Sequence, residues 1–220
     1  MRFEVLTTND CRWSIRNIVA LTEKGVDYVL VDVTSDGGKA PWYLALTPFG
    51  KTPALRHGGN VIVESLLMNE YIDEAAAGPP LMPTEPAARA WARIWMSYCD
   101  NTLMSTLIRL AKAKPPDRES CLTELRAELA RVDAAVFAHS RPGGLWHGER
   151  LGLVDLCYWT FFNALESTRV RLDLDDLMAT FPTIASWQEK LGEQEVFARA
   201  GELLDRLEPG GELPGLTRAG

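Results

Sequence analysis

Apolar and polar residues alternate between strand-like and helix-like spacing over the first part of the chain. A short apolar run at Phe3–Leu6 predicts a strand, and apolar side chains at helical intervals predict a helix over Cys11–Lys24. Gly25 ends this helix, as a C-terminal glycine commonly does, and the β-branched run Val26–Val33 predicts a second strand. A strand, helix, strand order predicts parallel pairing of the two strands.

The residues after this second strand predict a loop and then a β-hairpin. Thr34–Thr47 predicts a loop, whereas Ala54–His57 and Val61–Val63 flank a tight Gly-Gly-Asn turn. A helix over Leu66–Ala75 follows, for which Ser65 is a good N-cap. These elements predict a small mixed sheet with helices packed on it.

Beyond residue 76 the chain reads as helical. The Pro- and Gly-rich segment Ala76–Pro83 marks a domain boundary, and Thr84 is placed to cap the first helix after it. The predicted helices are Glu85–Lys112, Arg118–His139, Leu153–Glu166, Pro182–Lys190 and Glu193–Leu207. We therefore predict an N-terminal domain over residues 1–76, a linker over 77–84, an all-helical domain over 85–207 and a flexible tail over 208–220.

Composition narrows the class of protein. A net charge of −7 argues against a nucleic-acid-binding surface. No apolar run reaches the roughly 18 residues that span a bilayer, and the N-terminus lacks a signal-peptide pattern, so we expect a cytoplasmic protein without a membrane partner. The four cysteines form neither a CxxC pair nor a metal-ligand cluster with the three histidines. We therefore expect reduced thiols and no metal site.

Cys11 is the first candidate for chemistry. The predicted helix begins at this residue, where unpaired backbone N–H groups carry partial positive charge, and Arg12 and Arg16 add full charges nearby. Both effects favour the thiolate, which is the nucleophilic form of cysteine, whereas the carboxylate of Asp10 opposes it. The alternative is a structural cysteine, because free cysteines are among the most buried residues.

Three stretches carry a resemblance to a known family. They are LTPFGKTPALRHGGNVIVESLLMNEYIDE at Leu46–Glu74, LMPTEPAARAWARIWM from Leu81, and GERLGLVDLCYW at Gly148–Trp159. With these stretches and the predicted order of elements, residues 1–205 resemble the cytosolic glutathione transferases. The resemblance implies an α/β thioredoxin-like N-terminal domain followed by an all-α domain, glutathione as co-substrate, and a homodimer.

The resemblance also implies roles for residues around glutathione. Pro53 matches the family's cis-proline, and Thr52 would offer its main chain to the cysteinyl part of the tripeptide. Glu64 and Ser65 match the pair that binds the γ-glutamyl end, with Ser65 suited to the α-carboxylate and Glu64 to the α-ammonium. Taken singly, each residue has an ordinary reading as a turn proline, a surface charge or a helix cap.

Two further parts of the site follow from the same resemblance. Lys39 matches a residue that reaches the glycyl carboxylate in the omega class, and Trp42 would shield that end. A pocket for the second substrate is expected between the domains, with walls from Trp95, Tyr98 and Thr102. Against this, one of Trp91 and Trp95 is expected to belong to the core.

Asp155 lies in the mostly apolar helix Leu153–Glu166. Members of the family usually have Ser or Thr where this chain has Gly152, so the reciprocal hydroxyl cap is missing. We expect Asp155 to accept N–H bonds at the helix start and to serve folding rather than chemistry.

Cys11 decides the class within the family. Omega-like members have a cysteine here, typically followed by proline and an aromatic residue, whereas this chain has Arg12 and Trp13. Zeta-like members read roughly Ser-Ser-Cys-x-Trp-x-x-Arg; Cys11, Trp13 and Arg16 fit, but asparagine and aspartate replace both serines. The hydroxyl that would stabilise glutathione thiolate is therefore absent from its expected place, and the nearby substitutes are Thr7, Thr8 and Ser14.

The predicted function is that of a glutathione-dependent transferase or thiol reductase in which Cys11 forms a mixed disulfide with glutathione. Thioltransfer, deglutathionylation and reductive thioether cleavage are the implied reactions, on a small electrophilic or disulfide substrate. Two alternatives stay open. One is a zeta-like isomerase or conjugating transferase in which Cys11 is a bystander, and the other is a non-catalytic binding protein on the same fold.

Overall fold

The computed structural model describes residues 2–139, 144–175 and 177–216. The chain forms two compact units. The first combines the residues up to Leu81 with those from Gln194 onward, and the second runs from Met82 to Glu193. Among the described residues, no helix combines the length and the apolar character needed to cross a membrane.

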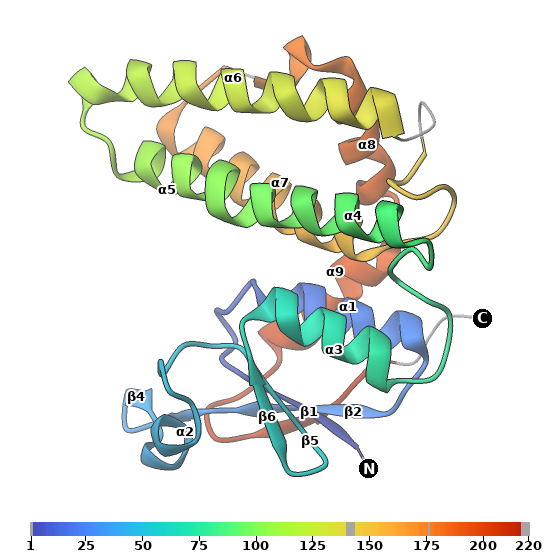
Figure 1. The fold of residues 1–220 in the computed structure, drawn as a ribbon. Helices are drawn as coiled ribbons and strands as arrows, with labels where there is room; N and C mark the ends of the chain where they lie inside the picture. Colours follow the sequence, from blue (N-terminus) through green and yellow to red (C-terminus); the bar gives the residue numbers. More distant parts are fainter. Residues whose placement is uncertain (1, 140–143, 176, 217–220) are drawn as a thin grey trace. The chain divides into compact units, whose positions relative to one another are not determined.

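A five-stranded mixed sheet organises the first unit (Figure 1), with the strand order β6–β5–β1–β2–β7. β1 and β2 are parallel, as the strand–helix–strand pattern predicted, and the other neighbouring strands are antiparallel. The strands are β1 (Phe3–Thr7), β2 (Tyr28–Asp32), β5 (Ala54–His57), β6 (Asn60–Val63) and β7 (Glu212–Pro214).

Helices cover this sheet. α1 (Ser14–Lys24) and α3 (Ser65–Ala75) lie side by side on one face (Figure 1), and α9 (Glu195–Asp205) packs against α1. An apolar cluster forms around Tyr43, whose buried partners are Leu6, Val29, Val31, Val33 and Ala54.

The segment predicted as a loop contains regular structure. It holds the short strands β3 (Thr34–Ser35) and β4 (Gly38–Lys39), followed by the helix α2 (Pro41–Leu46). The prediction was wrong here because two-residue strands and a six-residue helix are too short to show a hydrophobic period.

A buried ion pair joins α1 to α3. Lys24 Nζ lies 3.0 Å from the Asp73 carboxylate, and their side chains are 2% and 5% exposed. The Leu81 N–H donates to the same carboxylate, so both charges are paired and further hydrogen-bonded, as a buried pair requires. At Gly78, with φ of 111°, a Cβ would lie 2.4 Å from the Lys24 carbonyl oxygen, so the chain needs glycine there.

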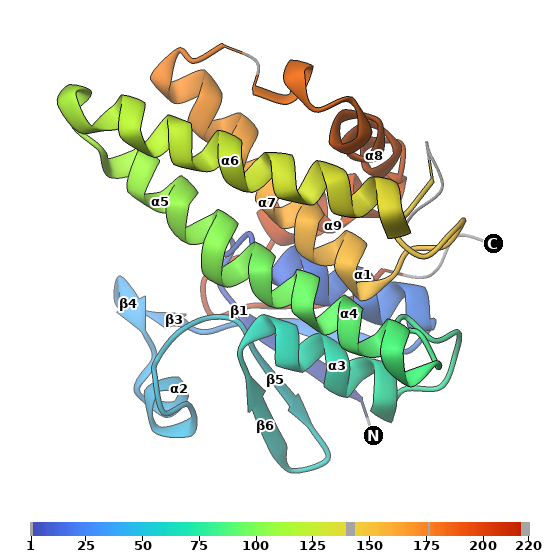
Figure 2. The same ribbon diagram turned by 45° about the horizontal axis from the view of Figure 1, so that its top comes forward.

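The second unit is all-helical in its described part (Figure 2). α5 and α6 run side by side, and α6 and α7 both pack against α8. The elements are α4 (Pro86–Tyr98), a π-helical turn η1 (Cys99–Leu103), α5 (Met104–Lys112), α6 (Pro115–His139), α7 (Leu153–Leu172), a 3-10 helix η2 (Leu177–Thr180) and α8 (Pro182–Gly192). The predicted fold class, α/β followed by all-α, is confirmed.

The predicted helix Glu85–Lys112 was wrong in two respects. The π turn η1 divides it into α4 and α5. Its N-cap is Glu85 rather than Thr84, because the Glu85 carboxylate accepts hydrogen bonds from the N–H groups of Ala87 (2.9 Å) and Ala88 (2.6 Å).

Asp155 is fully buried at the start of α7. Its carboxylate accepts hydrogen bonds from the backbone N–H groups of Trp146 and Gly152, both at 2.9 Å, and from the Trp187 indole at 2.8 Å. Burial raises the pKa of Asp155 to about 6, although the three donors act in the opposite direction. The predicted N–H bonds at the helix start are confirmed, and the cap is one-sided because Gly152 has no side chain to return a bond.

The segment from Glu208 was predicted to be flexible, but its described part continues the sheet. β7 pairs with β2, and the Gly215 N–H donates to the Tyr28 carbonyl at 2.9 Å. A Cβ at Gly215 would lie 2.4 Å from the Tyr28 ring. Gly215 therefore allows the chain to pack closely against Tyr28. Residues 217–220 lie outside the described part.

Candidate active site

Cys11 lies in the turn between β1 and α1. Its N–H donates to the Thr8 carbonyl at 3.1 Å, and its carbonyl accepts from the Ser14 N–H at 3.0 Å. The helix begins at Ser14 with Trp13 as N-cap, so the prediction that Cys11 occupies the first helical turn was wrong. The apolar period extended the prediction by three residues, because turn residues Cys11 and Trp13 are themselves apolar. Cys11 is 8% exposed.

The hydroxyl groups near Cys11 are engaged in hydrogen bonds with other side chains. The Thr7 and Ser14 hydroxyls share a hydrogen bond, and both residues are fully buried. The Thr8 hydroxyl donates to the Asp10 carboxylate at 2.6 Å. The three side chains considered as substitutes for the missing zeta-type hydroxyl therefore already have partners within the turn.

Arg16 connects this turn to the start of α3. The residue is 2% exposed, and its guanidinium lies 5.0 Å from the centre of the Trp13 ring, a cation–π contact. Its Nε donates to Ser65 Oγ at 3.0 Å, and a terminal nitrogen donates to the same oxygen. Since Ser65 Oγ accepts both bonds, its own hydroxyl hydrogen stays available to donate.

Ser65 is the first residue of α3, and the N-cap is Glu64 rather than Ser65 as predicted. Glu64 is exposed and has a φ of 65°, in the left-handed region that costs non-glycine residues about 1 kcal/mol or more. This backbone turns sharply from β6 into α3, so the first N–H groups of the helix and the Ser65 hydroxyl lie together at the helix start.

Two buried asparagines support the start of α3, and sequence reasoning did not identify them. Asn17 Nδ2 donates to the Ser65 carbonyl at 2.8 Å and to Asn69 Oδ1 at 2.6 Å. Both asparagines are fully buried. The signal in the sequence was an amide at a core-facing position of each predicted helix, where an apolar residue is the rule.

Two side chains donate hydrogen bonds to the backbone of the loop before β5. Lys39 Nζ donates to the Gly50 carbonyl at 2.5 Å, and the Tyr43 hydroxyl donates to the Lys51 carbonyl. Desolvation raises the pKa of Tyr43 to about 12, although hydrogen bonding with Thr47 acts in the opposite direction. The following Thr52–Pro53 peptide is cis, as the resemblance implied.

The residues expected around the ends of the site lie on separate elements. Trp42 lies on α2 and is 45% exposed. In the helical unit, Trp95 packs against Trp146 and Tyr98, with ring centroids 5.9 and 5.5 Å apart, whereas Trp91 is 47% exposed. Of the two tryptophans, Trp95 is therefore the one that joins the packed aromatic cluster.

Tyr98 and Thr102 lie on either side of the start of the π turn. The Tyr98 hydroxyl donates to the Glu128 carboxylate, and burial, together with that bond, raises the pKa of the phenol. Thr102 is half-buried within the turn.

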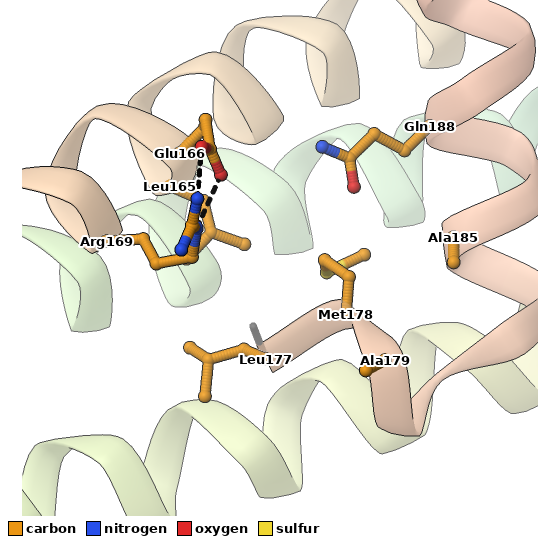
Figure 3. A pocket seen from close by; sticks show the side chains of 8 residues that line it. All are labelled: Leu165, Glu166, Arg169, Leu177, Met178, Ala179, Ala185 and Gln188. Atoms are coloured by element: carbon orange, nitrogen blue, oxygen red, sulfur yellow. Dashed lines mark hydrogen bonds and ion pairs between the residues drawn. The ribbon is translucent and has the colours of Figure 1, made fainter. Parts of the chain in front are cut away.

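A separate cavity of about 300 Å³ lies within the helical unit (Figure 3). Its walls come from α7, η2 and α8 and do not include the predicted pocket residues. Glu166 and Arg169 form a two-bond ion pair at 2.7 and 2.6 Å on one side, so their charges are already matched. The lining residues are Leu165, Glu166, Arg169, Leu177, Met178, Ala179, Ala185 and Gln188.

The first unit therefore carries polar groups at the start of α3 and a thiol in the turn before α1. The α3 start offers N–H groups, a hydroxyl and a carboxylate, and the turn before α1 offers sulfur.

Comparison with known proteins agrees with this geometry. Residues 10–75 match the family model for the glutathione S-transferase N-terminal domain. The chain is 30% identical over 200 residues to glutathione S-transferase U15 of Arabidopsis thaliana, covering 88% of this chain and 85% of that protein. It is 26% identical over 198 residues to glutathione S-transferase omega-1 of Rattus norvegicus, covering 89% and 78% respectively.

A solved structure gives the same result. The Tau class glutathione S-transferase from mango, Mangifera indica, superposes with a TM-score of 0.81 at 25% identity, covering 92% of this chain and 95% of that one. The similarity extends through both the mixed-sheet and the helical parts of the chain. This chain belongs to the glutathione S-transferase family.

Proposed function

We propose that this glutathione S-transferase uses Cys11 to form a mixed disulfide with glutathione, acting as a thioltransferase or thiol reductase. The observation that carries the proposal is the local arrangement around Cys11. The thiol lies between β1 and α1, while the hydroxyls of Thr7, Thr8 and Ser14 are held in hydrogen bonds of their own. Cys11, rather than one of these hydroxyls, is therefore the nucleophile of this turn.

Glutathione is bound at the start of α3 in this proposal. The Ser65 hydroxyl and the first N–H groups of the helix donate to the γ-glutamyl carboxylate, and the exposed Glu64 carboxylate pairs with the ammonium. The buried Arg16 strengthens the Ser65 hydroxyl as a donor, because a hydroxyl that accepts from a cation donates more strongly. Thr52 provides main-chain groups for the cysteinyl part.

The glycyl end and the second substrate are assigned on the same basis. Lys39 reaches the glycyl carboxylate, sharing its ammonium with the Gly50 carbonyl, and Trp42 shields that end. Trp95, Tyr98 and Thr102 form walls of the pocket for the second substrate. The working assembly is a homodimer, which sedimentation of the purified protein tests.

The chemistry is thiol–disulfide exchange in two steps. The Cys11 thiolate attacks the glutathione sulfur of a mixed disulfide, so the Cys11–glutathione S–S bond forms as the original S–S bond breaks and the substrate leaves as a thiol after gaining a proton. A second glutathione thiolate then attacks the glutathione sulfur of this adduct. Oxidised glutathione leaves and the Cys11 thiolate is restored.

A conjugating transferase is the second candidate, favoured by the similarity to the mango Tau class enzyme over nearly the whole chain. In that reaction the glutathione thiolate attacks an electrophile directly, and Cys11 is not consumed. The two functions share the glutathione site and differ in whether a bond to Cys11 forms.

The test compares the wild type with Cys11→Ser in two assays. Reduction of hydroxyethyl disulfide by glutathione reports exchange, and conjugation of 1-chloro-2,4-dinitrobenzene reports direct attack. We expect Cys11→Ser to lose exchange activity by at least about 100-fold, roughly 2.7 kcal/mol of transition-state stabilisation. Unchanged exchange activity in Cys11→Ser would overturn the proposal, and a gain in conjugation would favour the second candidate.

A further inference from the structure

Two cysteines that lie far apart in the sequence meet in the helical unit. Cys99 begins the π turn η1 and Cys157 lies in α7, and the two residues are 0% and 1% exposed. The carboxylate of Asp100 joins them, and the three ligand atoms lie within 4.8 Å of one another. We propose that Cys99, Asp100 and Cys157 bind a borderline-soft divalent cation of the zinc type.

The π turn explains how two neighbouring residues direct their side chains to one place. Successive residues of an α-helix point about 100° apart, so adjacent side chains normally face different surroundings. In η1 the Met104 N–H bonds to the Cys99 carbonyl, five residues earlier, which widens the turn and reduces that angle. Isolated π turns of this kind occur frequently at functional sites.

The distances around Cys157 fit tetrahedral coordination. Cys157 Sγ lies 3.6 Å from Asp100 Oδ1 and 3.7 Å from the Met96 carbonyl oxygen. With Zn–S of about 2.3 Å and Zn–O of about 2.0 Å, a sulfur and an oxygen ligand of one tetrahedral zinc are about 3.5 Å apart. Three side chains therefore supply three ligands, and the Met96 carbonyl oxygen lies at a ligand-to-ligand distance from Cys157 Sγ. Asp100 is only half-buried, so the cluster is not sealed on that side.

The exchange of protons for metal leaves the net charge of the cluster unchanged. Without metal, the Cys99 thiol donates to the Cys157 carbonyl and the Cys157 thiol to the Met96 carbonyl, so Asp100 carries the one negative charge. On binding, two S–H bonds break, two protons leave to solvent and two metal–sulfur bonds form. A dication with two thiolates and a carboxylate again sums to one negative charge, so burial of the filled site adds no net charge.

The metal site shares no residue with the proposed catalytic function, although Tyr98 and Thr102 of the proposed pocket lie on the same segment. Its consequence is structural: a bound ion ties α7 to the α4–α5 segment at the π turn. An ion that binds only the folded protein raises the unfolding temperature, and the rise grows with the logarithm of the free ion concentration above its dissociation constant.

The experiment uses Co²⁺ as an optical probe, added to reduced protein in a Cys11→Ser, Cys121→Ser background. This variant removes the two cysteines outside the cluster and keeps both cysteines within it. We expect the thiolate-to-cobalt absorption and the intense visible bands of a tetrahedral site, saturating at one Co²⁺ per chain and displaced by Zn²⁺. Zn²⁺ alone should raise the unfolding temperature, and a chelator should reverse the rise.

Three further substitutions in that background complete the test. Cys157→Ser and Cys99→Ser should each abolish the thiolate-to-cobalt band of the pair, and Asp100→Asn should weaken the apparent affinity at least tenfold. Circular dichroism of each variant confirms that it is folded. Absence of the bands in the Cys11→Ser, Cys121→Ser protein, or bands unchanged by both Cys157→Ser and Cys99→Ser, would overturn the proposal. So would thiol titration showing that Cys99 and Cys157 form a disulfide under reducing conditions.

Discussion

Two helices of this protein begin beside an acidic residue and use it in opposite ways. At α7, Asp155 is buried and its carboxylate accepts N–H bonds from three residues of the same unit. At α3, Glu64 is exposed in left-handed backbone, and Ser65 keeps a hydroxyl hydrogen to donate. A helix start is therefore structural where its groups are paired within the unit, and suited to a ligand where they are left to donate outward.

The largest expected effect is on the structural side of this comparison. Asp155→Ala leaves the N–H groups of Trp146, Gly152 and Trp187 buried without their acceptor, at a cost of about 4 kcal/mol in the free energy of unfolding. Urea unfolding followed by tryptophan fluorescence measures the loss. Glu64→Ala is the control at the other helix start, and a loss there as large as that of Asp155→Ala would break the comparison.

The pH dependence of stability is the next largest effect. The pKa of Asp155 is raised to about 6 in the folded protein from its ordinary 3.8, so between these values the folded state binds more protons than the unfolded state. The stabilisation from this group is complete below pH 3.8 and is lost as pH rises through 6, by about 3 kcal/mol in total. Unfolding free energies of the wild type minus those of Asp155→Asn, measured from pH 4 to 7, should fall over that range. A flat difference would contradict the assignment.

Ser65→Ala tests the ligand-binding side. We expect the KM for glutathione to rise about tenfold, about 1.4 kcal/mol, with a smaller change in kcat, because the hydroxyl binds the part of glutathione away from the reacting sulfur. Steady-state kinetics with glutathione as the varied substrate gives both constants. Ser105→Ala, at an exposed position of α5, is the matched control. An unchanged KM would place glutathione elsewhere.

The smallest effect concerns the backbone at Glu64. Glycine adopts a φ of 65° without the penalty that alanine has, so Glu64→Gly should be about 1 kcal/mol more stable than Glu64→Ala. Both variants lack the carboxylate and should weaken glutathione binding equally. Thermal unfolding and calorimetry of the pair separate backbone strain from ligand contact; equal stabilities would show that the position is not strained.

Local patterns in the sequence predicted much of the fold and part of the site. The β1–α1–β2 order and the hairpin ending at Val63 followed from hydrophobic period and turn residues, which depend on near neighbours. The positions of Cys11, Glu64 and Ser65 at element boundaries followed in the same way, to within a few residues. The family followed from ordered motifs rather than from any single residue.

Long-range pairing was not predictable from those patterns. Arg16 and Ser65 are 49 residues apart and Asn17 and Asn69 are 52 apart, and no local period links them. The pairing of β7 with β2 is also long-range and was not predicted. The segment that contains β7 is rich in proline and glycine and was predicted to be a flexible tail. The meeting of Cys99 with Cys157 is long-range as well, so the sequence predicted no metal site.

The central claim is that a bond forms between glutathione and Cys11, and intact-protein mass spectrometry tests it most directly. Reduced Cys121→Ser protein is incubated with oxidised glutathione, since Cys121 is partly exposed whereas the other three cysteines are buried. We predict one glutathione adduct per chain, mapped to Cys11, released by excess glutathione and absent from the Cys11→Ser, Cys121→Ser protein. An enzyme that reduces a disulfide substrate without this adduct, or an adduct that persists when Cys11 is replaced, would contradict the account.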